Sequence, residues 1–331
     1  MKRRHWIRAG ILGLIAVVIL VAGIVLLNDS EKDRYAEKRD TMSDGFGQLK
    51  TVTFGGVTYR EKPAVTTLLV VGVDKPEATE TVSGSYRDGG QADFLLLMAI
   101  DHTDKKIHQL QLDRDTMAEI DILGIFGNEV GTRREQLCLA HSFGKTPEDN
   151  AKYTIRAVER LLDGLEIEAY YMIDYSAMAA LNDALGGVKV KIAFDMEHLH
   201  PTWTKGSTVT LKGKEAEDFV RARMSVGSGT NEERMERQNE FMKNAIAQMK
   251  QKTAEDLSFG EHLLEQLQSL SVSNMTAKRL AEELNKAREY ETLAVEHPDG
   301  EYTEGKDGFV EFHMEDGAAV EWVLEHLYTK E

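Results

Sequence analysis

Two uninterrupted apolar runs constrain the fold of this chain more than any other feature. "TTLLVVGVD" covers residues 66–74 and "DFLLLMAID" covers residues 93–101, and a third segment, "KKIHQLQL", follows at 105–112. Strands that are apolar on both faces are typical of the centre of a sheet that helices cover. We therefore expect these segments to form buried central strands.

Helical and strand patterns alternate along the next part of the chain. Residues 150–165, "NAKYTIRAVERLLDGL", carry apolar side chains at helical spacing. Residues 169–192, "AYYMIDYSAMAALNDALGGVKVKI", predict a strand, a helix, a turn at Gly186-Gly187 and a second strand. This order indicates an α/β fold, with a sheet that is mixed in direction.

Both ends of the chain predict hairpins. "TVTFGGVTYR" (51–60) alternates around Gly55-Gly56, which is typical of a β-hairpin. From about residue 253 the sequence is charged and helical, and "EYTEGKDGFVEFHMEDGAAVEWVLEHLY" (301–328) predicts a closing hairpin and helix.

Composition excludes one broad class of partner. The 331 residues are 42% hydrophobic and carry a net charge of −16, which is sufficient for a sizeable core but argues against nucleic-acid binding, because that affinity needs a broad cationic surface. Any phosphate site must therefore be local. The only cysteine, Cys138, has no partner in the chain for a disulfide.

The N-terminus predicts a membrane anchor. Basic residues Lys2, Arg3, Arg4 and Arg8 precede an uncharged run from Ala9 to Leu27. A helix of that run would be about 28 Å long at about 1.5 Å per residue, close to the roughly 30 Å of a bilayer core. The basic start places the N-terminus in the cytoplasm and the following domain outside. A cleaved signal peptide is the alternative, but the run is long for one and no A-x-A site follows.

Aspartates stand at the ends of the predicted strands. Asp74 ends the first strand, Asp93 opens the second, and Asp113-Arg114-Asp115 ends the third. If the first two strands are neighbours, Asp74 and Asp93 could hold Mg²⁺, which takes one or two carboxylates together with phosphate oxygens and water. From spacing alone the alternative, that each aspartate caps a turn or helix, is the more common case.

The stretch "VRARMSVGSGTNEERMERQ" (220–238) concentrates cations in an acidic chain. Arg221 and Arg223 are two apart in an expected extended segment, and Arg234 and Gln238 share a helix face. Guanidinium groups match phosphate oxygens, so these arginines could clamp a pyrophosphate. The alternative is a solvated helix face paired with neighbouring glutamates, and we expect that for Arg237.

Six ordered blocks resemble the LytR-CpsA-Psr proteins of bacterial cell-envelope assembly. The resemblance runs over roughly residues 66–245 and rests on the order of the blocks more than on any one of them. They are "LLVVGVD", "QADFLLLMAID", "LQLDRDTM", "LNDALGGVKVKI", "LKGKEAEDFVRAR" and "NEERMERQ".

The resemblance implies a fold and an activity. The fold is a three-layer α/β/α sandwich with a mixed central sheet. The activity is extracytoplasmic transfer of a glycopolymer from a polyprenyl-pyrophosphate carrier to peptidoglycan. By position in the blocks, Asp74 and Asp93 become Mg²⁺ ligands. The residues implied to contact the pyrophosphate are Arg114, Arg221, Arg223 and Arg234, with Gln238 supporting them.

Three positions depart from the family pattern. The arginine expected two residues before Asp93 is Gln91 here, so that phosphate contact is missing or comes from Arg87. Asp113 replaces the proline of the Pro-Arg-Asp block and adds negative charge near the site. Asn231 stands three residues before the last arginine of the clamp, where many members have aspartate, which removes a possible general base.

The implied mechanism leaves the general base open. Phosphoryl transfer needs a neutralised anion and a nucleophile in line, and Asp93 and Asp115 are the candidates to take the hydroxyl proton, with Arg114 stabilising charge. "LLLMAI" and "YYMIDYSAMAAL" hint at a groove for the lipid, although such segments are more often core. A pyrophosphatase, in which water replaces the sugar, and a non-catalytic membrane-anchored binding or regulatory protein are alternatives.

Together these arguments divide the chain into four parts. Residues 1–28 are the cytoplasmic tip and transmembrane anchor, and 29–60 are a juxtamembrane spacer and hairpin. Residues 61–252 form the catalytic domain, and 253–331 form a C-terminal extension that we expect to pack on the same domain.

Overall fold

The computed structural model of the chain describes residues 50–74, 89–174, 176–222, 226–227, 258–287, 290–306 and 308–331, together with single positions and short stretches between 237 and 256. The expected membrane anchor lies outside these residues. Within them, no helix combines the length and the apolar character needed to span a bilayer.

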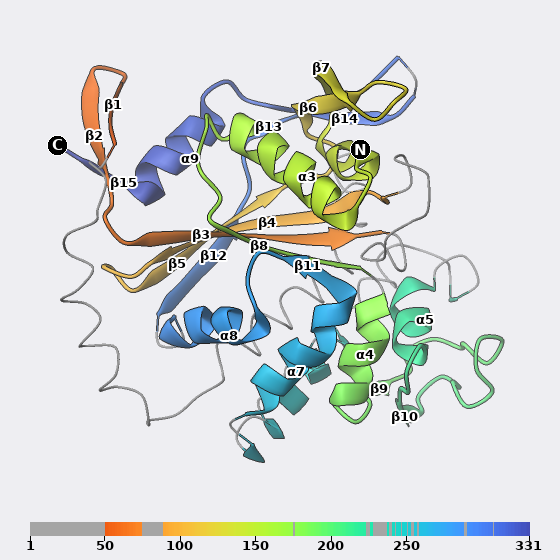
Figure 1. Cartoon of the computed structure of the whole chain (residues 1–331). Coiled ribbons are helices and arrows are strands. Elements are labelled where there is room, and N and C mark those ends of the chain that lie inside the picture. Colours follow the sequence, from red (N-terminus) through yellow and green to blue (C-terminus); the bar gives the residue numbers. More distant parts are fainter. Residues whose placement is uncertain are drawn as a thin grey trace.

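A six-stranded sheet forms the centre of the molecule (Figure 1). Its order is β11-β8-β3-β4-β5-β12. β8 is parallel to β3 and β12 is parallel to β5, whereas the other three pairs are antiparallel. The expected mixed sheet is therefore confirmed. The strands are β3 (Val65–Val73), β4 (Ala92–Asp101), β5 (Lys106–Leu112), β8 (Ala169–Asp174), β11 (Ser271–Ser273) and β12 (Glu291–Glu296).

The two apolar runs form strands because both of their faces are covered. Every residue of β4 is buried, and its side chains alternate between two apolar clusters, Leu95 and Leu97 in one and Leu96 and Met98 in the other. This alternation is what a strand between two layers requires. The predicted strand boundaries differ from the observed ones by one residue.

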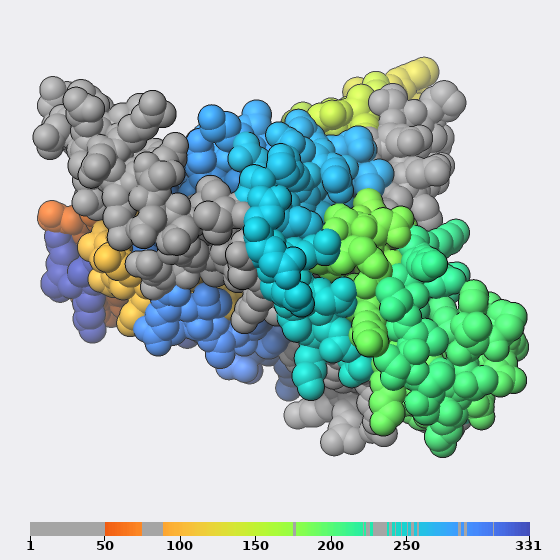
Figure 2. Space-filling model, turned by 90° about the horizontal axis from the view of Figure 1, so that it is seen from below, coloured from red at the N-terminus to blue at the C-terminus, as the bar shows by residue number. Residues whose placement is uncertain are grey.

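Helices lie on both faces of the sheet. Helices α3 and α9 cover one face, and α4, α5, α7 and α8 lie on the other, where Figure 2 shows them from below. The bounds are α3 (Pro147–Leu161), α4 (Ser176–Ala184), α5 (Glu215–Arg221), α7 (Phe259–Leu267), α8 (Ala277–Lys286) and α9 (Ala318–Leu327), with 3-10 turns η1 (Leu137–Phe143) and η2 (Gln268–Leu270). The chain is a mixed α/β domain built on this sheet.

Short antiparallel pairs surround the sheet. The hairpin at Gly55-Gly56 is confirmed, and both glycines adopt the positive φ, +58° and +80°, that such a tight turn requires. The C-terminal strand β15 pairs with this hairpin. The strands are β1 (Thr51–Phe54), β2 (Val57–Glu61), β6 (Met117–Leu123), β7 (Glu129–Gln136), β9 (Lys189–Lys191), β10 (Thr208–Thr210), β13 (Gly300–Glu304), β14 (Val310–Met314) and β15 (Tyr328–Lys330).

Candidate active site

The ends of three central strands meet at one edge of the sheet. Asp74 directly follows β3, and its N–H donates to the carbonyl oxygen of Gln91 at 3.0 Å. In the antiparallel β4–β5 pair Leu95 faces Leu112, so the same register places Asp93 across from Arg114. The sheet therefore brings the aspartate and arginine side chains that end the predicted strands to one place.

Arg114 is the central charge of this edge. Its guanidinium forms an ion pair with Asp93 through Nη1, and its Nε lies 3.4 Å from Oδ1 of Asp115. Nη2 donates to Oε1 of Gln91 at 2.5 Å and to Sγ of Cys138 at 3.3 Å. The Arg114 and Asp93 side chains are only 10% and 8% exposed. A buried guanidinium held by this many partners is fixed in position.

Gln91 links the two halves of this arrangement. Its backbone N–H donates to Oδ1 of Asp74 at 2.7 Å while its side-chain oxygen accepts from Arg114. An arginine at this position would have placed a second cation against Arg114. The glutamine instead connects the carboxylate of Asp74 to the guanidinium.

The negative charge that Asp113 is expected to add near the site is held by hydrogen bonds to both of its carboxylate oxygens. Its Oδ1 accepts from the backbone N–H of Asp115 at 2.8 Å, and its Oδ2 accepts from the hydroxyl of Tyr302 at 2.5 Å. Burial, followed by this hydrogen bond to Asp113, raises the pKa of Tyr302. Both oxygens of Asp113 are thus used to hold the turn after β5 against the β13–β14 hairpin.

Asp115 is held from several sides. Its Oδ1 faces Nε of Arg114 and also accepts from Nε2 of Gln136 at 3.3 Å, and its carbonyl oxygen accepts from the N–H of Phe312 at 2.8 Å. The Asp115 side chain is 15% exposed and lies beside the Arg114 guanidinium.

Cys138 lies beneath the guanidinium and is fully buried. Burial raises the pKa of its thiol to about 12, so the sulfur is protonated near neutral pH. A protonated, buried thiol is a poor nucleophile and a poor metal ligand. Its contact with Arg114 is therefore a packing and positioning contact.

The donor set at this edge is compatible with Mg²⁺. Asp74 and Asp93 offer carboxylate oxygens from neighbouring strand ends, and Asp74 is partly exposed, which leaves room for the waters that Mg²⁺ retains. Asp93 is 6% exposed. Its buried Oδ1 forms the ion pair with Arg114 and has no hydrogen-bond partner among the described residues. Hard oxygen donors of this kind suit Mg²⁺ better than softer metals.

Most of the predicted arginine clamp lies outside the described residues. This is true of Arg87, Arg223, Arg234 and Gln238, and of the departure at Asn231. Arg221 is the last residue of α5, and its side chain is not among those described.

Arg237 corrects an expectation. We expected a solvated helix face, but Arg237 is 2% exposed. Its Nε donates to the carbonyl oxygen of Phe219 at 3.1 Å, and its Nη2 donates to that of Ala222. A buried cation on carbonyls at a helix C-terminus satisfies groups that the helix leaves unpaired. Arg237 therefore fixes the end of α5, the backbone that carries Arg221.

Two further observations concern residues that sequence reasoning misplaced or missed. The segments suggested as a lipid groove, in β4 and in β8–α4, supply core side chains such as Leu96, Met178 and Leu181, so they do not form a groove. Asp174, which ends β8 beside Val73 and is fully buried, was not proposed. Its place at the end of an apolar run, like that of Asp74, is the signal that could have identified it.

Comparison with known proteins identifies the family that the chain resembles. Residues 24–321 match the model of the LytR_cpsA_psr family. A relative from Halalkalibacterium halodurans, polyisoprenyl-teichoic acid–peptidoglycan teichoic acid transferase TagU, is 27% identical over 73% of this chain and 70% of its own length. Biofilm regulatory protein A of Streptococcus mutans is 25% identical over 70% of this chain and 55% of its own length.

Solved structures share the fold. Protein gbs0355 from Streptococcus agalactiae superposes with a TM-score of 0.56 and 19% identity, covering 80% of this chain and 88% of the other. TagV of B. subtilis gives a TM-score of 0.51 and 18% identity over 80% and 96%. Since the family model matches most of the sequence, the chain belongs to the LytR-CpsA-Psr family.

Proposed function

We propose that the protein transfers a glycopolymer from a polyprenyl-pyrophosphate carrier to peptidoglycan. The observation that carries the proposal is the buried Arg114, held between Asp93 and Asp115 beside Asp74 at one edge of the sheet. Family membership supports it, and so does the teichoic acid transferase activity in the name of the TagU relative. Teichoic acid is the polymer that this relative suggests.

The residues at this edge of the sheet have different roles in binding the pyrophosphate. Arg114 stabilises negative charge on the pyrophosphate, and the predicted contacts of Arg87, Arg221, Arg223 and Arg234 add to it. Gln238 supports these cations.

The reaction itself exchanges one bond for another. A hydroxyl oxygen of the peptidoglycan glycan bonds to the phosphorus that bears the sugar, the bridging P–O bond breaks, and polyprenyl phosphate leaves. Asp93 or Asp115 accepts the hydroxyl proton. Both carboxylates lie against Arg114, so their charge is held in place before the reaction begins.

A magnesium ion is part of the proposal. Asp74 and Asp93 would hold it, and when bound it supplies positive charge to the phosphate oxygens. The protein contributes the position of the two carboxylates, which the β3–β4 pairing and the Gln91 hydrogen bond fix.

The location follows from the substrate and the N-terminal sequence. We propose a single-pass cell-membrane protein with a cytoplasmic N-terminus and an extracytoplasmic domain, since peptidoglycan and the lipid carrier meet at the outer surface of the membrane. Localisation of reporter fusions to the two ends of the chain would test this orientation.

A reconstituted reaction tests the function. Full-length protein in detergent would be incubated with a polyprenyl-pyrophosphate-linked teichoic acid, peptidoglycan and Mg²⁺. We expect polymer joined to peptidoglycan. Phosphate release without joined polymer would favour the pyrophosphatase, and binding without turnover would favour the regulatory protein.

A matched pair of variants ties the activity to the site. Arg114→Lys keeps the charge but loses the fork of donors, and we expect turnover to fall by about 10²–10³-fold, as for loss of one charge-stabilising donor. Arg133→Lys, on the exposed β7 strand, should leave turnover unchanged. Equal activity of both variants would contradict the assigned role of Arg114.

A further inference from the structure

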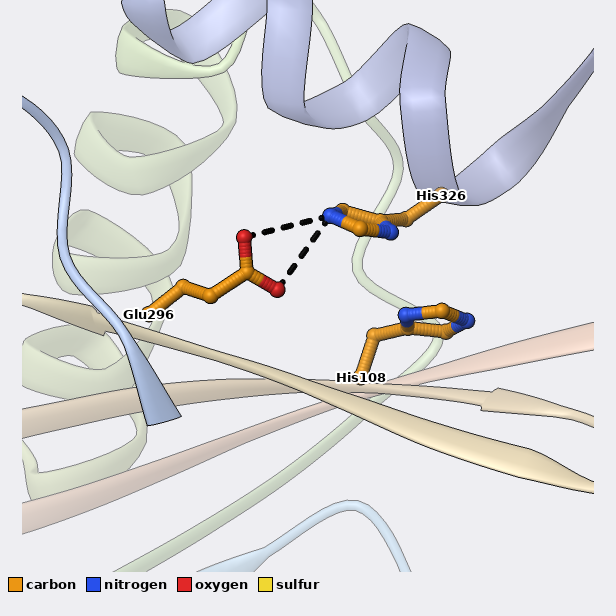
Figure 3. Close-up of side chains that lie close together, drawn as sticks. All are labelled: His108, Glu296 and His326. Atoms are coloured by element: carbon orange, nitrogen blue, oxygen red, sulfur yellow. Dashed lines mark hydrogen bonds and ion pairs between the residues drawn. The ribbon is translucent and has the colours of Figure 1, made fainter. Parts of the chain in front are cut away.

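A cluster of side chains of the types that can bind metal ions lies away from the proposed active site. It consists of His108 on β5, Glu296 at the end of β12 and His326 on α9, and Figure 3 shows the three side chains converging. One nitrogen or oxygen atom from each lies within 4.8 Å of those of the other two. His108 and Arg114 are six residues apart, on β5 and the turn that follows it. At about 3.3 Å per residue of extended chain, this corresponds to a separation of about 20 Å.

The three side chains of the cluster lie close together. Nε2 of His326 lies 3.3 Å from both carboxylate oxygens of Glu296. The rings of His108 and His326 are 4.3 Å apart between centroids, at an angle of 34°. Two imidazoles and one carboxylate thus face a common space.

The buried environment of His108 is the main indication of a bound ligand. It is 7% exposed, and it stands on the same face of β5 as Leu110 and Leu112, which belong to the apolar core under α9. Neither of its ring nitrogens has a hydrogen-bond partner among the described residues. A buried polar group without a partner is costly, and in native proteins it usually has a ligand, an ion or a water to satisfy it. A leucine at this position would avoid that cost.

We propose that His108, His326 and Glu296 bind one divalent transition-metal ion of the Zn²⁺ type. Two histidines and one glutamate are an established donor set for zinc. Bonds of about 2.0–2.1 Å in a tetrahedron place the donor atoms about 3.3 Å apart. The Glu296–His326 distance already has this value, and the His108 nitrogen, which lies within 4.8 Å of the other two donor atoms, would have to approach them on binding.

The surroundings suit such an ion. The Glu296 side chain is 42% exposed, which provides an entry path and space for water as the fourth ligand. Burial, and then the neighbouring His326, lowers the pKa of His108, which is the direction that favours the neutral imidazole form that binds metals. The imidazole nitrogens distinguish this site from the oxygen-only edge at Asp74 and Asp93.

The ion would connect parts of the chain that are distant in sequence. β5 is the strand next to the edge strand β12 and comes from the N-terminal half of the chain, whereas β12 and α9 come from the C-terminal segment. One ion would hold the edge strand and the covering helix to the core of the domain, and its binding would stabilise the folded chain.

Zinc titration of the full-length protein tests the proposal. The protein, purified in detergent without a histidine tag and stripped with EDTA, would be titrated with ZnCl₂ in excess Mg²⁺ to occupy oxygen-only sites. We expect one tightly bound equivalent by calorimetry and by elemental analysis. At about a hundredfold excess of Zn²⁺ over its Kd, the Tm should rise by roughly 5–10 °C.

Variants separate this site from other histidines. His108→Leu fits the apolar layer, and Glu296→Gln alters a partly exposed side chain. Each should weaken zinc binding at least about 100-fold, since loss of even an outer partner costs about 10–100-fold. His313→Gln is the control, because His313 also faces a glutamate, Glu311 at 3.0 Å, but has no second histidine in its cluster among the described residues.

The outcomes decide the proposal. Loss of binding in both variants, with the control unchanged, supports it. Absence of a tight equivalent in the wild-type chain, or binding by His108→Leu and Glu296→Gln at wild-type affinity, overturns it. If His108→Leu fails to fold by circular dichroism, Glu296→Gln alone gives the answer.

Discussion

The Arg114–Asp93 pair makes a strong prediction for stability. In the variant Arg114→Met the apolar volume of the side chain is largely retained, but Asp93 loses the charge that faces it. Since the two side chains are 10% and 8% exposed, solvent cannot replace the lost partner. We expect Arg114→Met to be among the most destabilising single changes at this edge of the sheet.

The magnitude follows from the burial of the pair. Removal of one partner of a buried ion pair costs about 3–5 kcal/mol, because the remaining charge is left uncompensated. At about 2–4 °C per kcal/mol for a chain of comparable size, the Tm should fall by roughly 6–20 °C. Replacing both partners, in Asp93→Asn/Arg114→Met, also removes the uncompensated charge of Asp93 and should restore at least about 2 kcal/mol.

A double-mutant cycle measures this coupling. The four proteins would be unfolded in urea in the presence of EDTA, so that no divalent ion can compensate Asp93, with fluorescence of the buried Trp203 and Trp322 as the signal. The matched control is Arg133→Met, since Arg133 is 65% exposed and should change stability by less than about 0.5 kcal/mol. A coupling energy near zero, or a loss in Arg114→Met no greater than in the control, would refute the reasoning.

Three further predictions concern buried groups. Arg237→Met leaves the carbonyl groups at the end of α5 without their donor and should lower the free energy of unfolding by about 2–4 kcal/mol in urea titrations; a loss below about 0.5 kcal/mol would exclude the capping role. Burial lowers the pKa of His141 to about 4 from its ordinary 6.5, so the unfolded chain binds the extra proton between these values. Stability should therefore fall by about 3 kcal/mol as the pH drops from 6.5 to 4, and His141→Gln should remove most of that slope. Cys138 should not react with a thiol reagent at pH 8 in the folded chain but should react stoichiometrically in denaturant; rapid reaction of the folded protein would contradict its burial.

The central strands could be predicted because burial on both faces requires a run of apolar residues, which is visible in the sequence. β3 has six apolar residues in succession (68–73) and β4 has seven (94–100), and runs of this kind, bounded by polar residues, favour buried strands in a globular chain. The β6–β7 hairpin was missed for the opposite reason. Its second strand, "EVGTRREQ", is largely exposed on both faces, so it has neither alternation nor an apolar run, and only its pairing with β6 makes it a strand.

The candidate site shows the same limit at the level of single residues. The strand-end position of Asp74 and Asp93 is visible in the sequence, and the antiparallel register then brings Asp93 to Arg114. The roles of Arg237 and His108 are not visible, because one cation binds backbone carbonyls and one histidine faces the distant Glu296 and His326. Contacts of this type depend on tertiary packing, which spacing along the chain does not encode.

The contacts of Arg114 also limit how it can bind a pyrophosphate. A guanidinium has five N–H donors, and in the structure Asp93, Asp115, Gln91 and Cys138 each face one of its nitrogens. Little donor capacity therefore remains for a two-point contact with phosphate while these partners stay in place. In the proposed function Arg114 must exchange one of these contacts for the ligand, or the other predicted arginines must supply the second point. The stability cycle and the Arg114→Lys turnover measurement together distinguish these cases, because exchange makes ligand binding depend on Asp93.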